Sequence, residues 1–212
     1  MLKIKSFVFS PIQENTYILY NEANECAIID PGCYFDNEKE QIAAFVEKMK
    51  LKPLFLLNTH CHLDHVFGNR WASERWKLPL EAHRLEEKVL ASFEKVCQMY
   101  GIPFGEAQPM PVNFIEAGET LTFGNTKLKV LLTPGHSPAS ISFYCEEEKF
   151  VLSGDVLFFE SIGRTDLPGG NFDTLIKSIR TQIFTLPDET VVLSGHGPAT
   201  TVRHEKEYNP FL

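Results

Sequence analysis

The sequence predicts a layered α/β (α+β) fold built around one core. Segments with strand periodicity alternate with segments of helical periodicity along the chain. The chain has 212 residues, and the 43% that are hydrophobic are spread along its length, enough for one sizeable core. Four apolar, strand-like runs also end on a histidine or an aspartate. We therefore expect one domain over residues 1–212, with a polar site where strands end.

The first part of the chain predicts strands around a single helix. Residues 2–9 alternate between apolar and polar side chains, and the apolar run 26–30 stops at Pro31 and Gly32. In NEKEQIAAFVEKMK, residues 37–50, the apolar side chains fall at helical spacing. Pro53 then closes this unit before the next strand. The strands predicted here are 2–9, 16–20, 26–30 and 54–58.

The remainder of the chain predicts three further helices, a second group of strands and a short C-terminal helix. Helices are expected near 66–76, 84–100 and 172–184. The proline-rich stretch IPFGEAQPMP, residues 102–111, is expected to be a surface connection that covers a site. Strands are predicted near 112–115, 119–123, 127–132, 140–145, 149–153 and 190–194.

Composition excludes several classes of partner. The formal net charge of -8 leaves no basic stripe for a phosphate backbone, so we expect no nucleic-acid partner. The five cysteines are odd in number and form no CxxC pair, which disfavours a disulfide framework or a thiolate zinc site. Charged residues and Pro11 interrupt the N-terminal apolar run, so we expect no signal peptide and no membrane association. These features favour a cytoplasmic protein.

The stretch NTHCHLDHVFGN, residues 58–69, holds three of the chain's seven histidines within six residues. His60 and His62 are two positions apart, so an extended segment would direct both side chains to one side. The turn through Leu63 would let Asp64 and His65 face a neighbouring metal. Histidine and aspartate at this density indicate metal binding.

Three further candidate ligands follow strand-like runs. His136 follows KVLLT, Asp155 follows FVLSG, and His196 follows VVLSG. Strands that end at the same edge would bring these side chains to the histidine cluster. Seven ligands are too many for one tetrahedral cation, whereas two cations that share a bridging ligand would use them all. Imidazole and carboxylate ligands favour two Zn²⁺ per chain, with iron or manganese as the alternative in either site.

The sequence resembles the metallo-β-lactamase-fold hydrolases, because it contains the motifs HCHLDH, TPGHS, SGD and SGHG in that order. The segments TPGHSPASISF, GDVLFFESIGRTDLPGG and GHGPATTV are most similar to short bacterial hydroxyacylglutathione hydrolases, or glyoxalase II. The resemblance implies a four-layer αβ/βα sandwich. It implies one metal on His60, His62 and His136, a second on Asp64, His65 and His196, and Asp155 as the bridge.

One departure from that family concerns the substrate pocket. Long glyoxalase II enzymes carry a C-terminal helical domain that supplies much of the glutathione pocket, but only residues 197–212 follow His196. We expect no such domain here. The family's basic residue nine positions after the bridging aspartate corresponds to Arg164, which we expect to bind a glutathione carboxylate. The alternative is an ion pair of Arg164 with Asp166 that stiffens the loop GRTDLPGG.

The expected function is hydrolysis of a small-thiol thioester such as S-D-lactoylglutathione. A hydroxide that bridges two metals has its pKa lowered toward about 7, and it would attack the carbonyl carbon. A thiolate, whose parent thiol has a pKa of about 8.5, can leave without a strong general acid. We assign Asp64 and Asp155 to catalysis as well as to metal binding. Amide cleavage, as of a β-lactam, is less favoured because the leaving amine needs a proton.

Three alternatives stay open. His60, His136 and Asp155 could hold a single Fe(II), as in the persulfide dioxygenases of this superfamily. A lactone would meet the same hydroxide as a thioester. A non-catalytic metal-binding module is disfavoured because no ligand of the set is lost. The segments GRTDLPGG and GHGP favour hydrolysis over oxidation.

The other conspicuous residues are assigned structural roles. Cys61 is expected to be a small buried filler, and His83 and His204 to be ordinary hydrogen-bonded or surface histidines. Phe158 and Phe159 are assigned to the core. For Asp30, an orienting role behind the metal loop and a simple strand-ending turn explain the sequence equally well.

Overall fold

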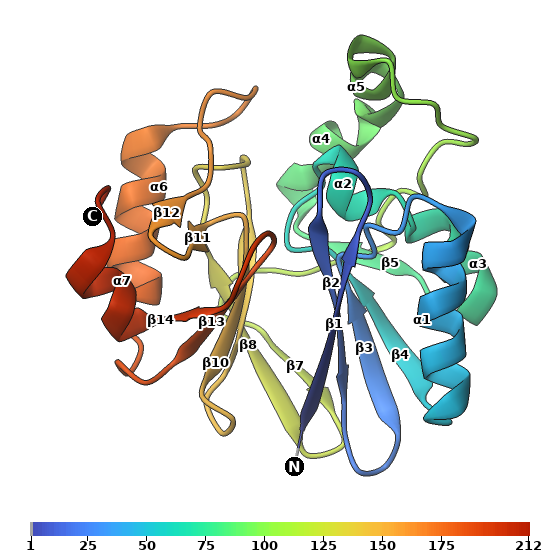
Figure 1. Ribbon diagram of the computed structural model, residues 1–212, viewed down its shortest axis with the longest axis horizontal. Coiled ribbons are helices and arrows are strands. Elements are labelled where there is room, and N and C mark those ends of the chain that lie inside the picture. Colours follow the sequence, from blue (N-terminus) through green and yellow to red (C-terminus); the bar gives the residue numbers. More distant parts are fainter. Residues whose placement is uncertain (1) are drawn as a thin grey trace. The chain divides into compact units, whose positions relative to one another are not determined.

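Two six-stranded sheets organise the computed structural model, which describes residues 2–212 (Figure 1). The chain divides into two compact units, each with one of these sheets. Unit 1 runs to Phe114 and includes Phe123–Asn125, and unit 2 comprises Ile115–Thr122 and Thr126–Leu212. Both units combine strands with helices, so the predicted α/β class is confirmed.

The sheet of unit 1 has the strand order β1-β2-β3-β4-β5-β6. Its first three strands form an antiparallel meander, and β3 to β6 are parallel. A parallel connection needs a crossover, and the helix α1, Asp36–Lys48, provides it between β3 and β4. The strands are β1 Lys3–Phe9, β2 Glu14–Tyr20, β3 Glu25–Ile29, β4 Lys52–Leu57, β5 Leu80–Ala82 and β6 Asn113–Phe114.

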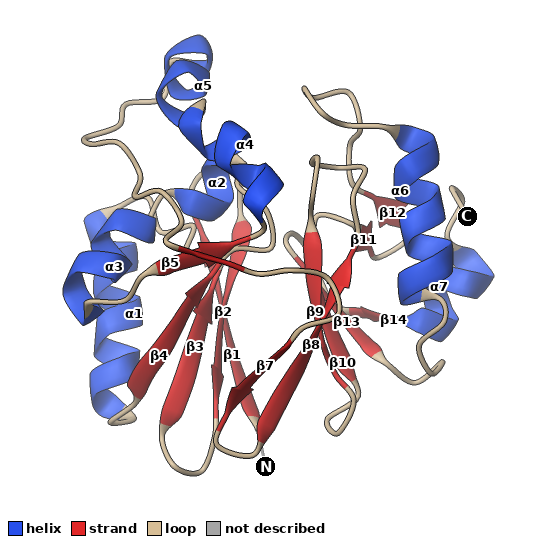
Figure 2. Cartoon of the chain, turned by 180° about the vertical axis from the view of Figure 1, so that it is seen from behind, coloured by secondary structure: helices blue, strands red, loops and turns tan. Residues whose placement is uncertain are grey.

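Helices cover one face of this sheet. Figures 1 and 2 show α1 and α3, Asn69–Trp76, on the same side of the strands. Ile42 and Val46 of α1 and Ala72 of α3 are buried in one apolar cluster with strand residues such as Ile28. This periodic burial explains why the segment predicted at 37–50 forms a helix. The other helices of unit 1 are α2 Leu63–Val66, a 3₁₀ turn Arg84–Glu86, α4 Glu87–Ala91 and α5 Phe93–Tyr100.

The sheet of unit 2 has the order β14-β13-β10-β9-β8-β7. The pairs β13 with β14, β9 with β10 and β8 with β9 are antiparallel, and β10 with β13 is parallel. The helices α6, Phe172–Ser178, and α7, Val202–Tyr208, pack on this sheet through Leu175 and Val202. The strands are β7 Thr120–Phe123, β8 Thr126–Leu132, β9 Ile141–Cys145, β10 Phe150–Gly154, β13 Val191–Ser194 and β14 Thr200–Thr201, with a small hairpin of β11 Leu157–Phe158 and β12 Ser161–Ile162.

Two predicted helices are interrupted. The helix expected at 66–76 breaks between α2 and α3 at Gly68, whose N–H donates to the Pro31 carbonyl at 2.7 Å. A Cβ at Gly68 would overlap the Cys33 Sγ, so this close approach needs glycine. The helix expected at 84–100 begins as the 3₁₀ turn and breaks again at Ser92 between α4 and α5. The predicted helix at 172–184 continues from α6 into a π-helical turn, Ile179–Ile183.

Residues 2–212 include all five cysteines and every helix that the structure describes. Each of these cysteines is free and buried. None of the helices in that range has the length and apolar character that crossing a membrane requires.

The side chain of Glu38 links the start of α1 to the β1–β2 hairpin through hydrogen bonds. Its side chain is buried, and Oε1 accepts a hydrogen bond from the Ser10 N–H at 2.8 Å. Oε2 accepts from the N–H groups of Tyr34 and Phe35 at 2.8 and 3.0 Å. One carboxylate therefore satisfies three backbone donors, two of them just before the first turn of the helix.

We expect Glu38→Ala to lower the free energy of unfolding by about 2–3 kcal/mol, because three backbone donors lose a charged acceptor. Chemical denaturation of the two proteins measures this difference. The control is Glu40→Ala, since Glu40 is exposed on the same helix; its effect should stay within about 0.5 kcal/mol. Equal stability of both variants would show that water replaces the carboxylate.

Candidate metal centre

Four predicted ligands of unit 1 come together between the end of β4 and α2. His62 immediately precedes α2, and Asp64 and His65 lie within it. The His60 ring centroid lies 4.8 Å from that of His62 and 4.1 Å from that of His65. His60 and His65 are fully buried, and Asp64 is 9% exposed. The segment HCHLDH thus gathers three imidazoles and a carboxylate at the carboxyl end of a parallel strand, where the sequence predicted them.

Asp30, directly after β3, binds this segment from behind. Its Oδ1 accepts from the Thr59 N–H at 2.7 Å, and its Oδ2 accepts from the Thr59 hydroxyl at 2.6 Å. His65 Nδ1 lies 3.1 Å from Asp30 Oδ2 and donates to it when it carries the ring proton. His65 Nε2 then keeps its lone pair and lies 3.8 Å from Asp64 Oδ2. Of the two interpretations of Asp30, this geometry supports the orienting role.

Glu14, in β2, is a second buried carboxylate beside this segment. Its Oε2 accepts from the Thr16 hydroxyl at 2.9 Å, and its Oε1 lies 3.9 Å from His65 Nδ1. Burial raises the pKa of Glu14 well above its ordinary value; His65 opposes this shift, whereas Asp30 and Asp64 add to it. A Cβ at Gly32 would overlap the Glu14 carboxylate, which explains the glycine of the DPG turn.

The three predicted ligands of unit 2 also come together. Asp155 and His196 follow the neighbouring parallel strands β10 and β13, and the Gly195 N–H donates to the Gly154 carbonyl at 2.8 Å. The Nε2 atoms of His136 and His196 each lie 3.5 Å from Asp155 Oδ2. One oxygen of Asp155 therefore lies close to two imidazole nitrogens, as expected for a ligand shared by two cations.

These distances fit a metal centre. A separation of 3.5 Å is long for a hydrogen bond. Two ligands at 2.0–2.2 Å from one tetrahedral cation lie about 3.4 Å apart. His136 Nδ1 donates to the Arg164 carbonyl at 2.8 Å, so its Nε2 offers a lone pair toward Asp155. Imidazole and carboxylate ligands with this geometry suit zinc or iron.

Arg164 makes the ion pair that the sequence offered as an alternative. Its Nε and Nη2 donate to the two carboxylate oxygens of Asp166, both at 2.7 Å. This bidentate contact lowers the pKa of Asp166 to about 2. The side chain of Arg164 is thus engaged by Asp166, while its backbone carbonyl holds His136. Binding of a substrate carboxylate by Arg164 stays a prediction.

The loop that carries Arg164 packs tightly against the unit 2 ligands. A Cβ at Gly163 would overlap the Asp155 carbonyl oxygen and would lie 3.2 Å from the His136 Cβ. The Asn171 N–H, at the far end of this loop, donates to the Gly135 carbonyl at 2.8 Å, next to His136. The segment GRTDLPGG therefore positions His136 through its backbone.

The other conspicuous residues mostly have the roles predicted for them. Cys61 is 2% exposed within the apolar cluster of unit 1, and burial and then the charge of Glu86 raise the pKa of its thiol. His83 Nδ1 accepts from the Leu85 N–H, and His204 Nε2 lies 3.0 Å from Glu160. These findings confirm the filler and hydrogen-bonded roles.

The core assignment of two phenylalanines was wrong. Phe159 is 45% exposed and stacks on His204 with ring centroids 4.8 Å apart. Phe158 is only partly buried, and its ring centroid lies 6.2 Å from that of His196. Apolar character alone did not reveal that the chain turns after Asp155 into the short hairpin of β11 and β12, which is too small to bury both rings.

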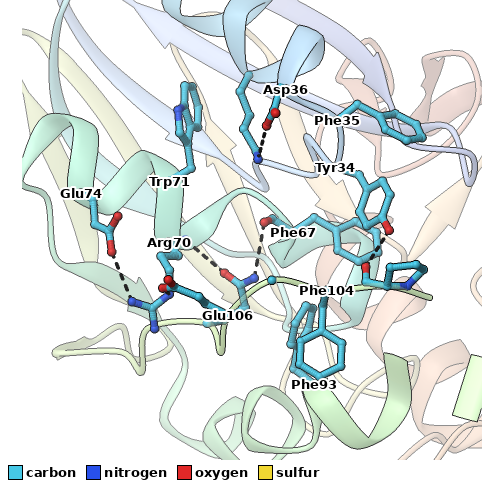
Figure 3. Close-up of a pocket in the computed structure, with 14 residues that line it drawn as sticks. Tyr34, Phe35, Asp36, Phe67, Arg70, Trp71, Glu74, Phe93, Phe104 and Glu106 are labelled. Carbon is cyan, nitrogen blue, oxygen red and sulfur yellow. Dashed lines mark hydrogen bonds and ion pairs between the residues drawn. The ribbon is translucent and has the colours of Figure 1, made fainter. Parts of the chain in front are cut away.

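Unit 1 also carries a pocket of about 710 Å³, which the 102–108 segment borders (Figure 3). The Tyr34 hydroxyl donates to the Pro103 carbonyl at 2.6 Å, and Arg70 Nε donates to the Ala107 carbonyl. Aromatic side chains, among them Phe67 and Phe93, line this pocket, and none of the predicted metal ligands does. The proline-rich connection thus borders a pocket of its own unit.

Comparisons with known proteins agree with this geometry. The family model described as the metallo-beta-lactamase superfamily matches residues 10–196. The chain is 41% identical to the probable metallo-hydrolase YqgX of Bacillus subtilis, over 100% of this chain and 98% of that protein. It is 35% identical to the hydroxyacylglutathione hydrolase GloC of Haemophilus influenzae, over the same shares of the two chains.

Two solved structures are similar over nearly the whole chain. BLEG-1, a B3 metallo-beta-lactamase, is 39% identical with a TM-score of 0.90, over 99% of both chains. TTHA1623, solved in a di-iron-bound form, is 36% identical with a TM-score of 0.88, over 98% of this chain and 100% of that one.

Gly163→Ala should weaken zinc binding by about tenfold or more, because the added methyl group displaces the loop that orients His136 and Asp155. Competition with a chromophoric chelator measures the affinity. The matched control is Gly105→Ala, where a Cβ meets no atom within 4 Å. If the first variant binds zinc as the unmodified protein does, the loop does not position the ligands.

Proposed function

Because the chain belongs to the metallo-β-lactamase superfamily, we propose that it is a zinc-dependent hydrolase of small-thiol thioesters such as S-D-lactoylglutathione. The observation that carries this proposal is the full-length similarity to a hydroxyacylglutathione hydrolase. The two proteins align over 98% of that relative's length, so the relative does not owe its named activity to a long additional domain. The superfamily's mixed α/β fold accords with the sheets and helices of both units.

We assign the ligands by the superfamily's pattern. The fold implies a binuclear centre built on histidines, and the ligand geometry within each unit supports this. Zinc is the proposed metal, and the di-iron form of TTHA1623 makes iron the principal alternative. In this proposal His60, His62 and His136 would hold the first metal, Asp64, His65 and His196 would hold the second, and Asp155 would be the ligand that both share.

The bound metals would supply a water of lowered pKa and an electrophile for the carbonyl oxygen. The protein's own groups prepare the ligands for this. Asp30 and the Arg164 carbonyl hold the Nδ1 protons of His65 and His136, so that each Nε2 is available. Asp155 and Asp64 place carboxylate charge beside these nitrogens. A thioester suits this site because its thiolate leaves without a proton from an acid.

Similarity to BLEG-1 favours β-lactam hydrolysis as a second candidate. Cleavage of a β-lactam amide requires protonation of the leaving nitrogen, which a thioester does not. The two candidates therefore differ in their need for a proton donor, and parallel assays with a chromogenic cephalosporin and with S-D-lactoylglutathione separate them.

We expect the zinc-loaded protein to remove the thioester absorbance of S-D-lactoylglutathione, and a strong chelator to abolish this activity. Asp155→Ala should also abolish it, because the proposed bridging ligand is lost. Asp173→Ala is the control, since Asp173 is exposed at the start of α6. An intact thioester in the presence of metal-loaded protein would refute the proposed activity.

For Arg164, the expected effect is on substrate binding. Arg164→Ala should raise the KM for S-D-lactoylglutathione by about three- to tenfold with little change in kcat, because a charge-assisted contact to a glutathione carboxylate is lost. Asp166→Asn should lower this KM, since it releases the guanidinium.

A lactoyl thioester of an uncharged small thiol is the control substrate, and its KM should not change in either variant. Equal changes for both substrates would mean that Arg164 acts only through loop structure.

A further inference from the structure

Glu86 is a buried carboxylate to which the sequence assigned no function. It lies at the end of the 3₁₀ turn Arg84–Glu86, between β5 and α4, and its exposed fraction is 0%. Transfer of a carboxylate from water to the interior is costly unless hydrogen bonds compensate for it. The position of Glu86 therefore calls for an account of what its oxygen atoms bind.

The topology of unit 1 brings the Glu86 turn beside the metal-binding segment. β4 and β5 are parallel neighbours, with Leu56 paired to Leu80 and Leu57 to Glu81. Just beyond β4, the Asn58 N–H donates to the Glu81 carbonyl at 3.1 Å. The chain that follows β5 consequently runs next to the chain that follows β4, which carries HCHLDH.

Glu86 contacts the backbone between two predicted ligands. Its Oε2 accepts a hydrogen bond from the Cys61 N–H at 3.0 Å. Two residues earlier, the Thr59 N–H donates to Asp30 at 2.7 Å. Buried carboxylates from two different segments thus hold the amides on either side of His60. The hydrogen-bonded amides of Thr59 and Cys61 restrict the backbone on both sides of His60 and directly before His62. They therefore restrict the directions in which the two imidazoles point.

We propose that Glu86 is a positioning residue of the metal centre, which holds His60 and His62 in ligating geometry through the Cys61 N–H. This inference rests on the metal binding in the proposed function and not on the choice of substrate. Outer-shell hydrogen bonds of this kind typically change metal affinity by 10- to 100-fold. Through this hydrogen bond Glu86 acts on the backbone of the metal-binding segment, at the amide between His60 and His62.

The test compares the Zn²⁺ affinity of full-length variants by competition with a chromophoric chelator. Glu86→Ala removes the acceptor, and Glu86→Asp retracts the carboxylate by one methylene group; both should bind Zn²⁺ about tenfold to 100-fold more weakly. Glu86→Gln keeps an amide oxygen at the same place and should stay within about threefold of the unmodified protein. Glu87→Ala, a change of the less buried neighbouring glutamate, is the control and should have no effect.

A second measurement separates positioning from general stability. Amide hydrogen exchange of the metal-free proteins should show faster exchange at Cys61 in Glu86→Asp, with unchanged protection in the strands of unit 2. This measurement also decides the case if Glu86→Ala does not fold.

Unchanged Zn²⁺ affinity in Glu86→Ala or Glu86→Asp, or a loss in Glu86→Gln as large as that in Glu86→Ala, would overturn the proposal. Tight Zn²⁺ binding by an unmodified protein that leaves thioesters intact would refute the proposed activity alone.

Discussion

The buried carboxylate of Asp30 is the group on which the ligand segment of unit 1 depends. It accepts hydrogen bonds from the backbone and hydroxyl of Thr59, from the side chain of Asn58, and from His65 Nδ1 in the tautomer described above. These contacts join the end of β3 to the segment after β4 and to α2. Asp30 has a φ of +49°, a conformation that aspartate tolerates better than most residues. A carboxylate suits this position because it accepts several hydrogen bonds and donates none.

Unit 2 orients its histidine by a different means. The Arg164 carbonyl, rather than a carboxylate, accepts from His136 Nδ1. A neutral carbonyl can be buried at a lower cost than a charge, but it must be delivered by a closely packed backbone. Gly163 permits this approach, because any side chain there would overlap the Asp155 carbonyl. The orientation of His65 therefore requires an acidic side chain at Asp30, whereas the orientation of His136 requires a glycine at Gly163, next to Arg164.

Much of this arrangement could be predicted because ligands at strand ends carry a strong sequence signal. An apolar run that ends just before a histidine or aspartate indicates a strand, and it also indicates which end of that strand carries the site. Asp155 after β10 and His196 after β13 are examples. The short strand β5 carried no such signal, since three residues show no periodicity. Glu86 was missed for a related reason: a glutamate in a polar segment predicts an exposed side chain. The pairing of β5 with β4 brings the turn that contains Glu86 next to Cys61, and the sequence does not reveal this pairing.

The same carboxylates link metal affinity to the stability of unit 1. Glu14, Asp30 and Glu86 are almost completely buried around HCHLDH, and Asp64 is buried within it. Burial raises the pKa of Glu14; the neighbouring His65 lowers it, whereas the charges of Asp30 and Asp64 raise it, so these two acids repel a negative charge on Glu14. A cation on the neighbouring imidazoles and Asp64 would offset that repulsion. A cation bound there would therefore also favour the folded segment, and metal binding and folding would be coupled through these buried acids.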